Sequence, residues 1–353
     1  MNKNLLGKIL FISLLLVSVT CAAAGNKLTK ITMVLARSVE VLDDTHIHVA
    51  SEMGYFKEEG LEVILQQSYG TTDVRMLGAG QADVAFPSPA VQLVAHGNNI
   101  PIKSFFAIDQ RNIWAYAVLP NSGINSISDL KGKTISLGDA GWSQISNPLL
   151  RRAGVDPKDV EYVPAGENRA QLVWEGKIDA VLTWEKEYQL WQAQGMDFQI
   201  IYAADYFDTC ASSIATNTKT IEKNPELLKR FGRAVAKGLY FCKLNPAAAT
   251  EIVLEKFPSI RVDIKGALKA IEGLVYITND DTTEKYGYGY HNKADWEINI
   301  EDSLIEGIIS KPIPVEEVYT NEFVEFYNDF DHIKVEADAA NYKLKPKYQV
   351  LAK

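Results

Sequence analysis

Hydrophobic and polar positions in the first third of the chain predict short strands that alternate with helices. The predicted strands are residues 31–36, 61–65 and 83–86. The predicted helices run from Asp44 or Thr45 to Met53, from Gly70 to Leu77 and from Ser88 to Gly97. Ser88 followed by Pro89 is a typical helix start, with serine as the cap and proline in the first turn. Alternation at this spacing indicates parallel βαβ units and an α/β fold.

Three positions of this pattern recur 96 residues later in the chain. Gly70, Gly80 and Asp83 correspond in this way to Gly166, Gly176 and Asp179. In each copy a glycine opens a helix, a second glycine ends it, and a strand with an aspartate follows. Any two βαβ units share some of these features, but three matches at one offset favour two lobes of similar plan.

The middle of the chain supplies the strands of the second lobe. An apolar stretch, residues 113–119, predicts a long strand that crosses between the lobes, and residues 212–216 predict the return crossing. Further strands are predicted at 133–137, 160–163, 180–184 and 198–202. A strong helix begins at Pro225, with apolar residues at every fourth position from Leu227 to Leu239. The chain is then mostly helical to Asn328, and no regular structure is assigned after Asp331.

The N-terminal residues 1–24 have the pattern of a secretory signal peptide. Lys3 and Lys8 precede an apolar run of about eleven residues, too short to span a bilayer comfortably, and small residues follow at 22–24. An N-terminal membrane anchor is the alternative. Cys21 lies where a lipid could be attached, although the residues before it form a poor lipoprotein box. We therefore expect an exported protein, cleaved near Ala24 or lipid-anchored through Cys21.

Composition narrows the possible functions of the exported chain. The 353 residues carry a formal net charge of -9, which becomes -11 when Lys3 and Lys8 are removed. An acidic surface of this kind argues against binding to nucleic acid. Only 3 cysteines are present, which excludes a disulfide-dense scaffold and cysteine-ligated zinc or iron–sulfur centres. After processing, Cys210 and Cys242 remain, either paired or as free thiols.

Loops that follow the predicted strands are the expected ligand-binding segments, because ligands of open α/β sheets lie beyond the carboxyl ends of the strands. Tryptophans at strand ends can form the flat walls of a pocket, and Glu185 beside Trp184 can accept hydrogen bonds from a ring amine. The alternatives are tryptophans that pack within their own lobe and a solvated glutamate. The candidate ligand-binding residues are Asp43, Asp44, Tyr69, Gly70, Ser88, Trp114, Tyr116, Trp142, Ser143, Glu167, Trp184 and Glu185.

Enzymatic motifs are absent from the sequence. No G-x-S-x-G, H-E-x-x-H, G-x-G-x-x-G or Walker-type loop occurs, and we expect no catalytic residue and no cofactor. His46 and His48 would share a face of a strand, but on the predicted helix they diverge by about 200°. A metal site is therefore not expected there.

Four segments resemble the periplasmic solute-binding proteins of ABC importers, in the branch that binds sulfonates, nitrate, taurine and thiamine-pyrimidine precursors. These segments are 50–61 (ASEMGYFKEEGL), 80–85 (GQADVA), 128–135 (SDLKGKTI) and 176–180 (GKIDA). The resemblance covers roughly residues 30 to 325. Trp296, residues 307–309 and residues 319–321 look like the thiamine-precursor members of this branch.

The resemblance implies a two-lobed, type II-like fold, in which each lobe is a mixed, mostly parallel sheet flanked by helices and two strands form the hinge. It places the first lobe at 28–110 and 214–330, the second lobe at 112–208, and a tail at 331–353. Members of this family close their lobes over a small molecule and dock on a permease in the inner membrane. The resemblance thus implies a monomer in the periplasm or at the outer face of the cell.

The candidate pocket residues favour one ligand class. Aromatic walls combined with carboxylates suit a flat, nitrogen-rich ring such as a thiamine pyrimidine precursor, whereas a site for a sulfonate, taurine or nitrate should offer more lysine and arginine. Arg37 is the main cation of these loops. Two further alternatives are an enzyme like the thiamine-pyrimidine synthases, whose cysteine-rich motif this chain lacks, and a ligand-sensing module.

Overall fold

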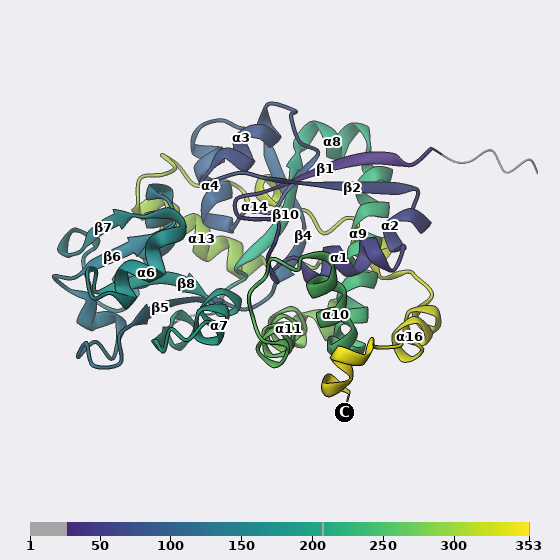
Figure 1. Cartoon of the computed structure of the whole chain (residues 1–353). Helices are drawn as coiled ribbons and strands as arrows, with labels where there is room; N and C mark the ends of the chain where they lie inside the picture. The colour runs from purple at the N-terminus through teal and green to yellow at the C-terminus, as the bar shows by residue number, and fades with distance from the viewer. Residues whose placement is uncertain (1–26, 207, 353) are drawn as a thin grey trace, which may run out of the picture.

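The computed structural model describes residues 27–206 and 208–352. The predicted signal peptide and Cys21 lie outside the described residues. The chain forms two lobes, each built on a five-stranded sheet with helices on its faces (Figure 1). Within the described ranges, no helix is long and apolar enough to cross a membrane. The predicted α/β, two-lobed fold class is confirmed.

The first lobe is built on a mixed sheet in the order β2-β1-β3-β10-β4. β1 pairs in parallel with β2 and β3, whereas β10 is antiparallel to both of its neighbours. The bounds of its strands are β1 (Thr29–Leu35), β2 (Leu61–Gln67), β3 (Val84–Ala85), β4 (Ile102–Asp109) and β10 (Ser212–Asn217).

The second lobe repeats this plan with the order β7-β6-β8-β5-β9. Here β6 is parallel to β7 and β8, and β5 takes the antiparallel fourth place. The bounds of its strands are β5 (Trp114–Val118), β6 (Thr134–Leu137), β7 (Glu161–Pro164), β8 (Ala180–Trp184) and β9 (Gln199–Tyr202). The 96-residue repeat in the sequence therefore corresponds to one architecture used twice.

The repeated aspartates have the same structural role in the two lobes. Asp83 accepts a hydrogen bond from the backbone N–H of Thr32 at 2.7 Å, and Asp179 accepts one from that of Thr134 at 2.9 Å. Each of these bonds joins the start of the third parallel strand of a lobe to the first one, β3 to β1 and β8 to β6. The repeated glycines agree as well, because Gly80 and Gly176 both have φ of 70°, a left-handed conformation that favours glycine at a helix end.

Helices cover both faces of the first sheet. Ile31, Met33 and Leu35 on one face of β1 pack toward α1 and α9, whereas Val34 on the other face packs toward α3 and α4. The apolar stripe predicted for the helix after Pro225 is buried in α9, where it forms part of the largest core. The helices are α1 (Thr45–Glu52), α2 (Tyr55–Glu58), α3 (Thr72–Gly78), α4 (Pro89–Gly97), α8 (Thr218–Lys223) and α9 (Pro225–Leu244).

The C-terminal helices extend the first lobe and reach the second. α11 packs against α7 of the second lobe (Figure 1). α13 packs against α4, and hydrogen bonds join its C-terminal end to α5. These helices are α10 (Pro246–Lys256), α11 (Ile264–Thr278), α12 (Asp281–Tyr286), α13 (Lys293–Ile305), α14 (Val315–Val318) and α15 (Val324–Asn328). The helices of the second lobe are α5 (Ser143–Arg152), α6 (Arg169–Trp174) and α7 (Glu185–Ala193).

The chain passes between the lobes through two short segments. β4 ends at Asp109 in one sheet and β5 begins at Trp114 in the other, so the first crossing lies in residues 110–113. The sequence predicts that residues 113–119 themselves cross, but β5 pairs with β8 and β9 along its whole length. Its continuous apolar character comes from its position inside the second sheet, where both faces are buried. The return crossing, which the sequence predicts at residues 212–216, likewise lies before β10, because those residues form β10 itself.

Residues after Asp331, to which the sequence assigns no regular structure, form a helix and a final turn. α16 (His332–Ala340) and a 3₁₀ turn (Pro346–Leu351) pack against the first lobe. Tyr348 is 1% exposed, and its hydroxyl donates to Glu255 at 3.0 Å. These anchors are long-range contacts, and local periodicity does not reveal them.

The segment that carries much of the family resemblance has a structural role. Glu59 is buried and accepts hydrogen bonds from Arg233 at 2.9 and 2.8 Å and from Lys237 at 3.0 Å, both on α9. Burial opposes the ionisation of Glu59, but these two cations hold its pKa below the usual value. The glutamate thus anchors α9 to the turn between α2 and β2.

Candidate functional site

The cleft between the lobes contains a cavity at the carboxyl ends of the parallel strands, as expected for this topology. It encloses about 630 Å³, part of which opens to solvent. A second cavity of about 510 Å³ lies toward the mouth and shares Arg37, Gly70, Trp142 and Trp184 with the first. We call them the central and mouth cavities.

Three tryptophans of the second lobe form one wall of the central cavity. The ring centres of Trp114, Trp142 and Trp184 lie 5.8 to 6.4 Å apart, with interplanar angles of 63° to 78°. Each ring therefore meets the other two edge to face, a favourable aromatic geometry. Trp114 begins β5, Trp184 ends β8 and Trp142 follows β6, so all three lie at the cleft edge of the second sheet.

Each of the three cations that line these cavities is next to a carboxylate. Arg37 lies 2.6 Å from Asp44. Arg169 contacts Glu187, and its guanidinium stacks within about 5 to 6 Å of the rings of Trp142 and Trp184.

The third cation, Lys186, lies across the cleft from its partners. It is 2% exposed, and its Nζ lies 3.7 Å from Asp43 and 3.9 Å from Asp109, both in the first lobe. An incoming anion would have to compete with these internal carboxylates for all three cations.

Contacts across the cleft show that the lobes are closed on each other. The indole N–H of Trp184 donates to Asp43 at 2.6 Å, which joins the end of β8 to the loop before α1. Gly70 approaches the Asp139 side chain of the opposite lobe so closely that a Cβ would lie 2.8 Å from it. Any larger residue at position 70 would force the two loops apart.

Polar atoms without partners gather on the first-lobe side of the central cavity. Among the described residues, no hydrogen-bond partner exists for either carboxylate oxygen of Asp73, for Oδ1 of Asp109 or for Nε of Arg37. Burial raises the pKa of Asp73 to about 7, and burial likewise raises that of Glu187 to about 7 against the opposing charge of Arg169. Unpartnered buried polar groups are uncommon in proteins, so those at this cavity are candidates for ligand recognition.

The structure brings eight of the twelve predicted residues to the cleft. Six line the central cavity, namely Asp43, Gly70, Ser88, Trp114, Trp142 and Trp184. Tyr69 and Glu167 line the mouth cavity, where Tyr69 is 63% exposed.

The remaining four predicted residues point elsewhere. Asp44 is fully buried behind Arg37, and burial raises its pKa against the opposing Arg37 charge. Tyr116 lies two residues deeper in β5 than Trp114, about 7 Å from the cleft edge, where its hydroxyl meets Ser146. Ser143 faces an outer groove beside Arg151.

Glu185 is the fourth of these residues. It begins α7 and turns toward α11 rather than toward the ligand cavities, where its carboxylate accepts a hydrogen bond from Gln189 at 3.4 Å. Burial raises its pKa.

The prediction from the sequence did not include several residues of the cavities, most of which lie at the start of a helix. Asp73 lies in the first turn of α3, Lys186 in the first turn of α7 and Arg169 at the start of α6. The sequence could have indicated these three residues, because each lies one to three residues after a loop that was predicted to bind the ligand. Asp109 lies at the end of β4, which pairs in the sheet with β10. Because β10 follows about 100 residues later in the chain, only the sheet topology shows that Asp109 reaches the cleft.

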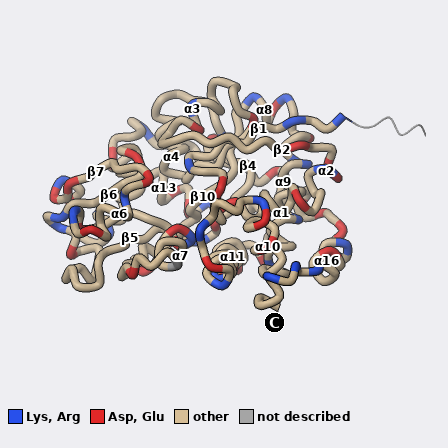
Figure 2. The backbone as a smooth tube through the Cα atoms, viewed as in Figure 1, with Lys and Arg blue, Asp and Glu red and all other residues tan. Residues whose placement is uncertain are grey.

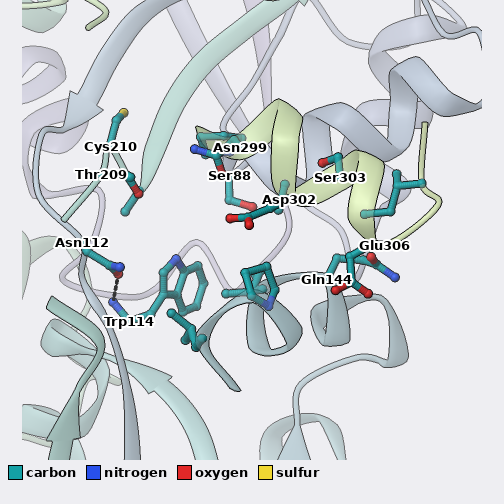
Figure 3. A pocket seen from close by; sticks show the side chains of 17 residues that line it. Ser88, Asn112, Trp114, Gln144, Thr209, Cys210, Asn299, Asp302, Ser303 and Glu306 are labelled. Carbon is teal, nitrogen blue, oxygen red and sulfur yellow. Dashed lines mark hydrogen bonds between the residues drawn. The ribbon is translucent and has the colours of Figure 1, made fainter. Parts of the chain in front are cut away.

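A further cavity of about 500 Å³ lies on the other side of Trp114, between α5 and α13. Ser88, Trp114 and Asp302 gather around this space in Figure 3, with Gln144 and Glu306 at its far end. Asp302 and Glu306 bridge the lobes here: Arg152 of α5 lies 2.8 Å from Asp302, and Asn147 donates to Glu306 at 2.7 Å. Arg151 also contacts Glu306.

His46 and His48 lie on a helix, as predicted, and both are buried with the pKa lowered by burial. Within the described residues no group of three or more metal-ligating side chains comes together. Cys210 and Cys242 are buried, free thiols in the described structure.

Charges of both signs are interspersed over the two lobes (Figure 2). Blue Lys and Arg segments alternate with red Asp and Glu segments, and the chain as a whole is acidic.

Two lobes of one plan, closed on an aromatic and acidic cleft, form the fold of the periplasmic binding proteins. The chain belongs to the NMT1/THI5-like family, whose model matches residues 43–249. The family resemblance predicted from the sequence is thereby confirmed.

Named relatives differ in what they do. The chain is 28% identical over 288 residues to the riboflavin-binding protein RibY of Chloroflexus aurantiacus, which covers 78% of this chain and 81% of that protein. It is 27% identical over 234 residues to the 4-amino-5-hydroxymethyl-2-methylpyrimidine phosphate synthase THI13 of Saccharomyces cerevisiae, covering 62% and 68%. The alkanesulfonate-binding protein SsuA of Xanthomonas axonopodis pv. citri, bound to MOPS, shares the fold with a TM-score of 0.66 at 10% identity, covering 83% and 98%.

Proposed function

We propose that this protein captures a flat aromatic nitrogen heterocycle between its lobes and delivers it to an ABC-type import permease. The wall of three tryptophans, opposite a surface of carboxylates whose neighbouring cations already have partners, is the observation that carries the proposal. Stacked or edge-on indoles suit a flat ring, and free acceptors suit its N–H groups. A pyrimidine precursor of thiamine is the ligand we favour.

The two named relatives support this ligand class in different ways. THI13 is named for a phosphorylated 4-aminopyrimidine, and RibY is named for riboflavin, whose ring system is also flat and rich in nitrogen. Riboflavin is therefore a second candidate ligand, favoured by RibY, whose match covers 78% of this chain.

A sulfonate or another small anion fits the cleft less well. Arg37, Arg169 and Lys186 would each have to leave an internal carboxylate to bind it. The fold shared with SsuA at 10% identity does not carry its ligand preference to this chain.

An enzyme that makes the thiamine pyrimidine is the competing class of function, because THI13 is named as a synthase. The thiols of Cys210 and Cys242 have raised pKa values caused by burial, which keeps them protonated and poorly nucleophilic at neutral pH. We infer a binding protein that releases its ligand unchanged, acting as a monomer in the periplasm or lipid-anchored at the cell surface.

Tryptophan fluorescence titration tests the proposal, because the three cleft indoles report on ring binding. Three panels separate the ligand classes: 4-aminopyrimidines, riboflavin, and alkanesulfonates with taurine. We expect quenching or a spectral shift with one of the first two panels. A response to sulfonates with silence toward both ring panels would refute the heterocycle. Native mass spectrometry of the complex should recover the added compound with unchanged mass, whereas a converted product would indicate an enzyme.

A further inference from the structure

Asp73 is a buried carboxylate in the wall of the central cavity that has no partner of its own. It lies in the first turn of α3, three residues after the cleft loop at Gly70, and its side chain is 0% exposed. Within the described part of the chain, neither of its oxygens has a hydrogen-bond partner. Protein interiors seldom keep such a group, and those that do usually have a ligand or a reaction for it.

The charged groups around Asp73 already have other contacts. Arg37, from the loop after β1, pairs with Asp44, and its guanidinium lies 4.7 Å from the ring centre of Phe86. Arg75, on the same helix as Asp73, donates to the Thr71 hydroxyl at 2.8 Å. The other ionisable groups of the two cavities are Asp43, Asp109, Lys186, Asp139, Glu167, Arg169 and Glu187.

Burial without a charge partner leaves Asp73 ready to share a proton near neutral pH. Desolvation raises its pKa to about 7, against smaller opposing effects of the Arg37 charge and of the backbone N–H groups of Val74 and Asp73, which lie near the carboxylate but outside hydrogen-bond geometry. A carboxyl group in this state can offer one oxygen as an acceptor and place a proton on the other.

We infer that Asp73 is the residue that recognises the amino edge of the ligand ring, an inference that rests on the proposed function. On a 4-aminopyrimidine, the exocyclic amine donates to one carboxylate oxygen, and the adjacent ring nitrogen shares a proton with the other. The pair needs one proton in all, held either by the carboxyl or by the ring. An analogue with hydrogen in place of the amine lacks this donor and leaves one carboxylate oxygen unpaired.

Two consequences follow for binding. The protein discriminates the amino ring from this analogue by about 10- to 100-fold, the effect expected when one buried polar group is left unpaired. Above pH 7 the free Asp73 is ionised, so binding of a neutral ring must take up a proton, and affinity for the amino ring falls by up to about tenfold per pH unit. Glu187 also titrates near pH 7, but it lies with Arg169 in the mouth cavity.

The test uses the full-length protein with Asp73→Asn and Asp73→Leu, titrated with 4-amino-5-hydroxymethyl-2-methylpyrimidine and its analogue with hydrogen at position 4 between pH 6 and 9. Asparagine keeps the shape and both hydrogen bonds but cannot ionise, whereas leucine removes the hydrogen bonds. Asp281→Asn is the matched control, since it removes an exposed carboxylate from the first turn of α12. Circular dichroism and thermal unfolding establish that each variant is folded.

We expect the wild type and Asp281→Asn to prefer the amino ring, with affinity falling above pH 7. Asp73→Asn should lose this pH dependence, and Asp73→Leu should lose the preference, to within about threefold. If folded Asp73→Leu keeps the wild-type preference, or Asp73→Asn keeps the pH slope, the inference is wrong while the proposed function stands. If the wild type binds sulfonates and no ring compound, the proposed function itself fails, and the role of Asp73 fails with it.

Discussion

Breaking the ion pairs between α5 and α13 is expected to weaken ligand binding by favouring the open arrangement of the lobes. Asp302 of α13 and Glu306 directly after this helix pair with Arg152 and Arg151 of the second lobe, so these pairs join the two lobes in the closed arrangement. The replacements Asp302→Asn and Glu306→Gln, made together, keep the shapes and remove both charges. Neither residue lines the central or mouth cavity.

The magnitude follows from the partial exposure of these pairs. The side chains of Asp302 and Glu306 are 13% and 9% exposed, and those of the two arginines are about 30% exposed. Exposed pairs contribute up to about 1 kcal/mol and hydrogen bonds between charged groups somewhat more, so we expect a loss of about 1 to 2 kcal/mol of closure free energy. That loss corresponds to about a 5- to 30-fold increase in Kd, because affinity scales with the population of the closed state.

Stopped-flow tryptophan fluorescence provides the assay, with small-angle scattering to follow lobe opening. The increase in Kd should appear mainly as faster dissociation, and the radius of gyration of the ligand-free protein should increase. Glu301→Gln on the exposed side of α13 is the matched control. A double variant whose Kd lies within twofold of this control would refute the reasoning, as would a loss confined to the association rate.

Three further predictions concern stability. Glu59→Ala should cost about 3 kcal/mol of unfolding free energy, because it leaves Arg233 of α9 without its buried partner. Glu226→Gln, which breaks an exposed ion pair on α9, should cost under about 1 kcal/mol. Urea denaturation of the two variants measures the difference. The folded pKa of Glu59 is below 4.5, so its contribution should be present above pH 4.5 and lost as the pH falls further; a loss that does not depend on pH would contradict this. The folded pKa of Asp73 is about 7 against a usual 3.8, so its ionisation destabilises the fold increasingly as the pH rises from 4 to 7. Asp73→Asn should therefore raise the unfolding free energy at pH 8 by on the order of 3 kcal/mol. Thermal unfolding at pH 5 and 8 measures this, and no gain in stability at pH 8 would contradict the prediction. Tyr348→Ala should cost about 3 kcal/mol because the tail packs on the first lobe through this ring, and unchanged thermal unfolding would show that the tail is dispensable.

Local patterns along the chain were enough to predict the fold class and much of the cleft. Apolar runs identified the strands, and the rule that ligands lie at strand ends selected Trp142 and Trp184 before any contact was known. The repeat of Gly70, Gly80 and Asp83 predicts two lobes of similar plan, and the two sheets do share one strand arrangement.

The remaining parts depend on three-dimensional register and on partners far away in the sequence. Tyr116 shares a strand face with Trp114, but β5 runs away from the cleft, so the tyrosine is buried in the core. Glu185 and Lys186 are neighbours at the start of α7, and only the rotation of that helix decides that the lysine enters the cleft. A linear pattern does not specify such rotations, because both residues suit a helix start equally well.

The two lobes reuse one architecture but present different chemistry to the cleft. The first lobe supplies the unpartnered carboxylates, including Asp73, whereas the second supplies the indoles of Trp114, Trp142 and Trp184. The two sets pack in different clusters, because the indoles lie against Ile113, Ala211 and Ile277, whereas α3, which carries Asp73, packs through Val74 and Leu77. A protein divided in this way can alter its preference for ligand shape and its preference for ligand charge independently, by substitutions in one lobe at a time.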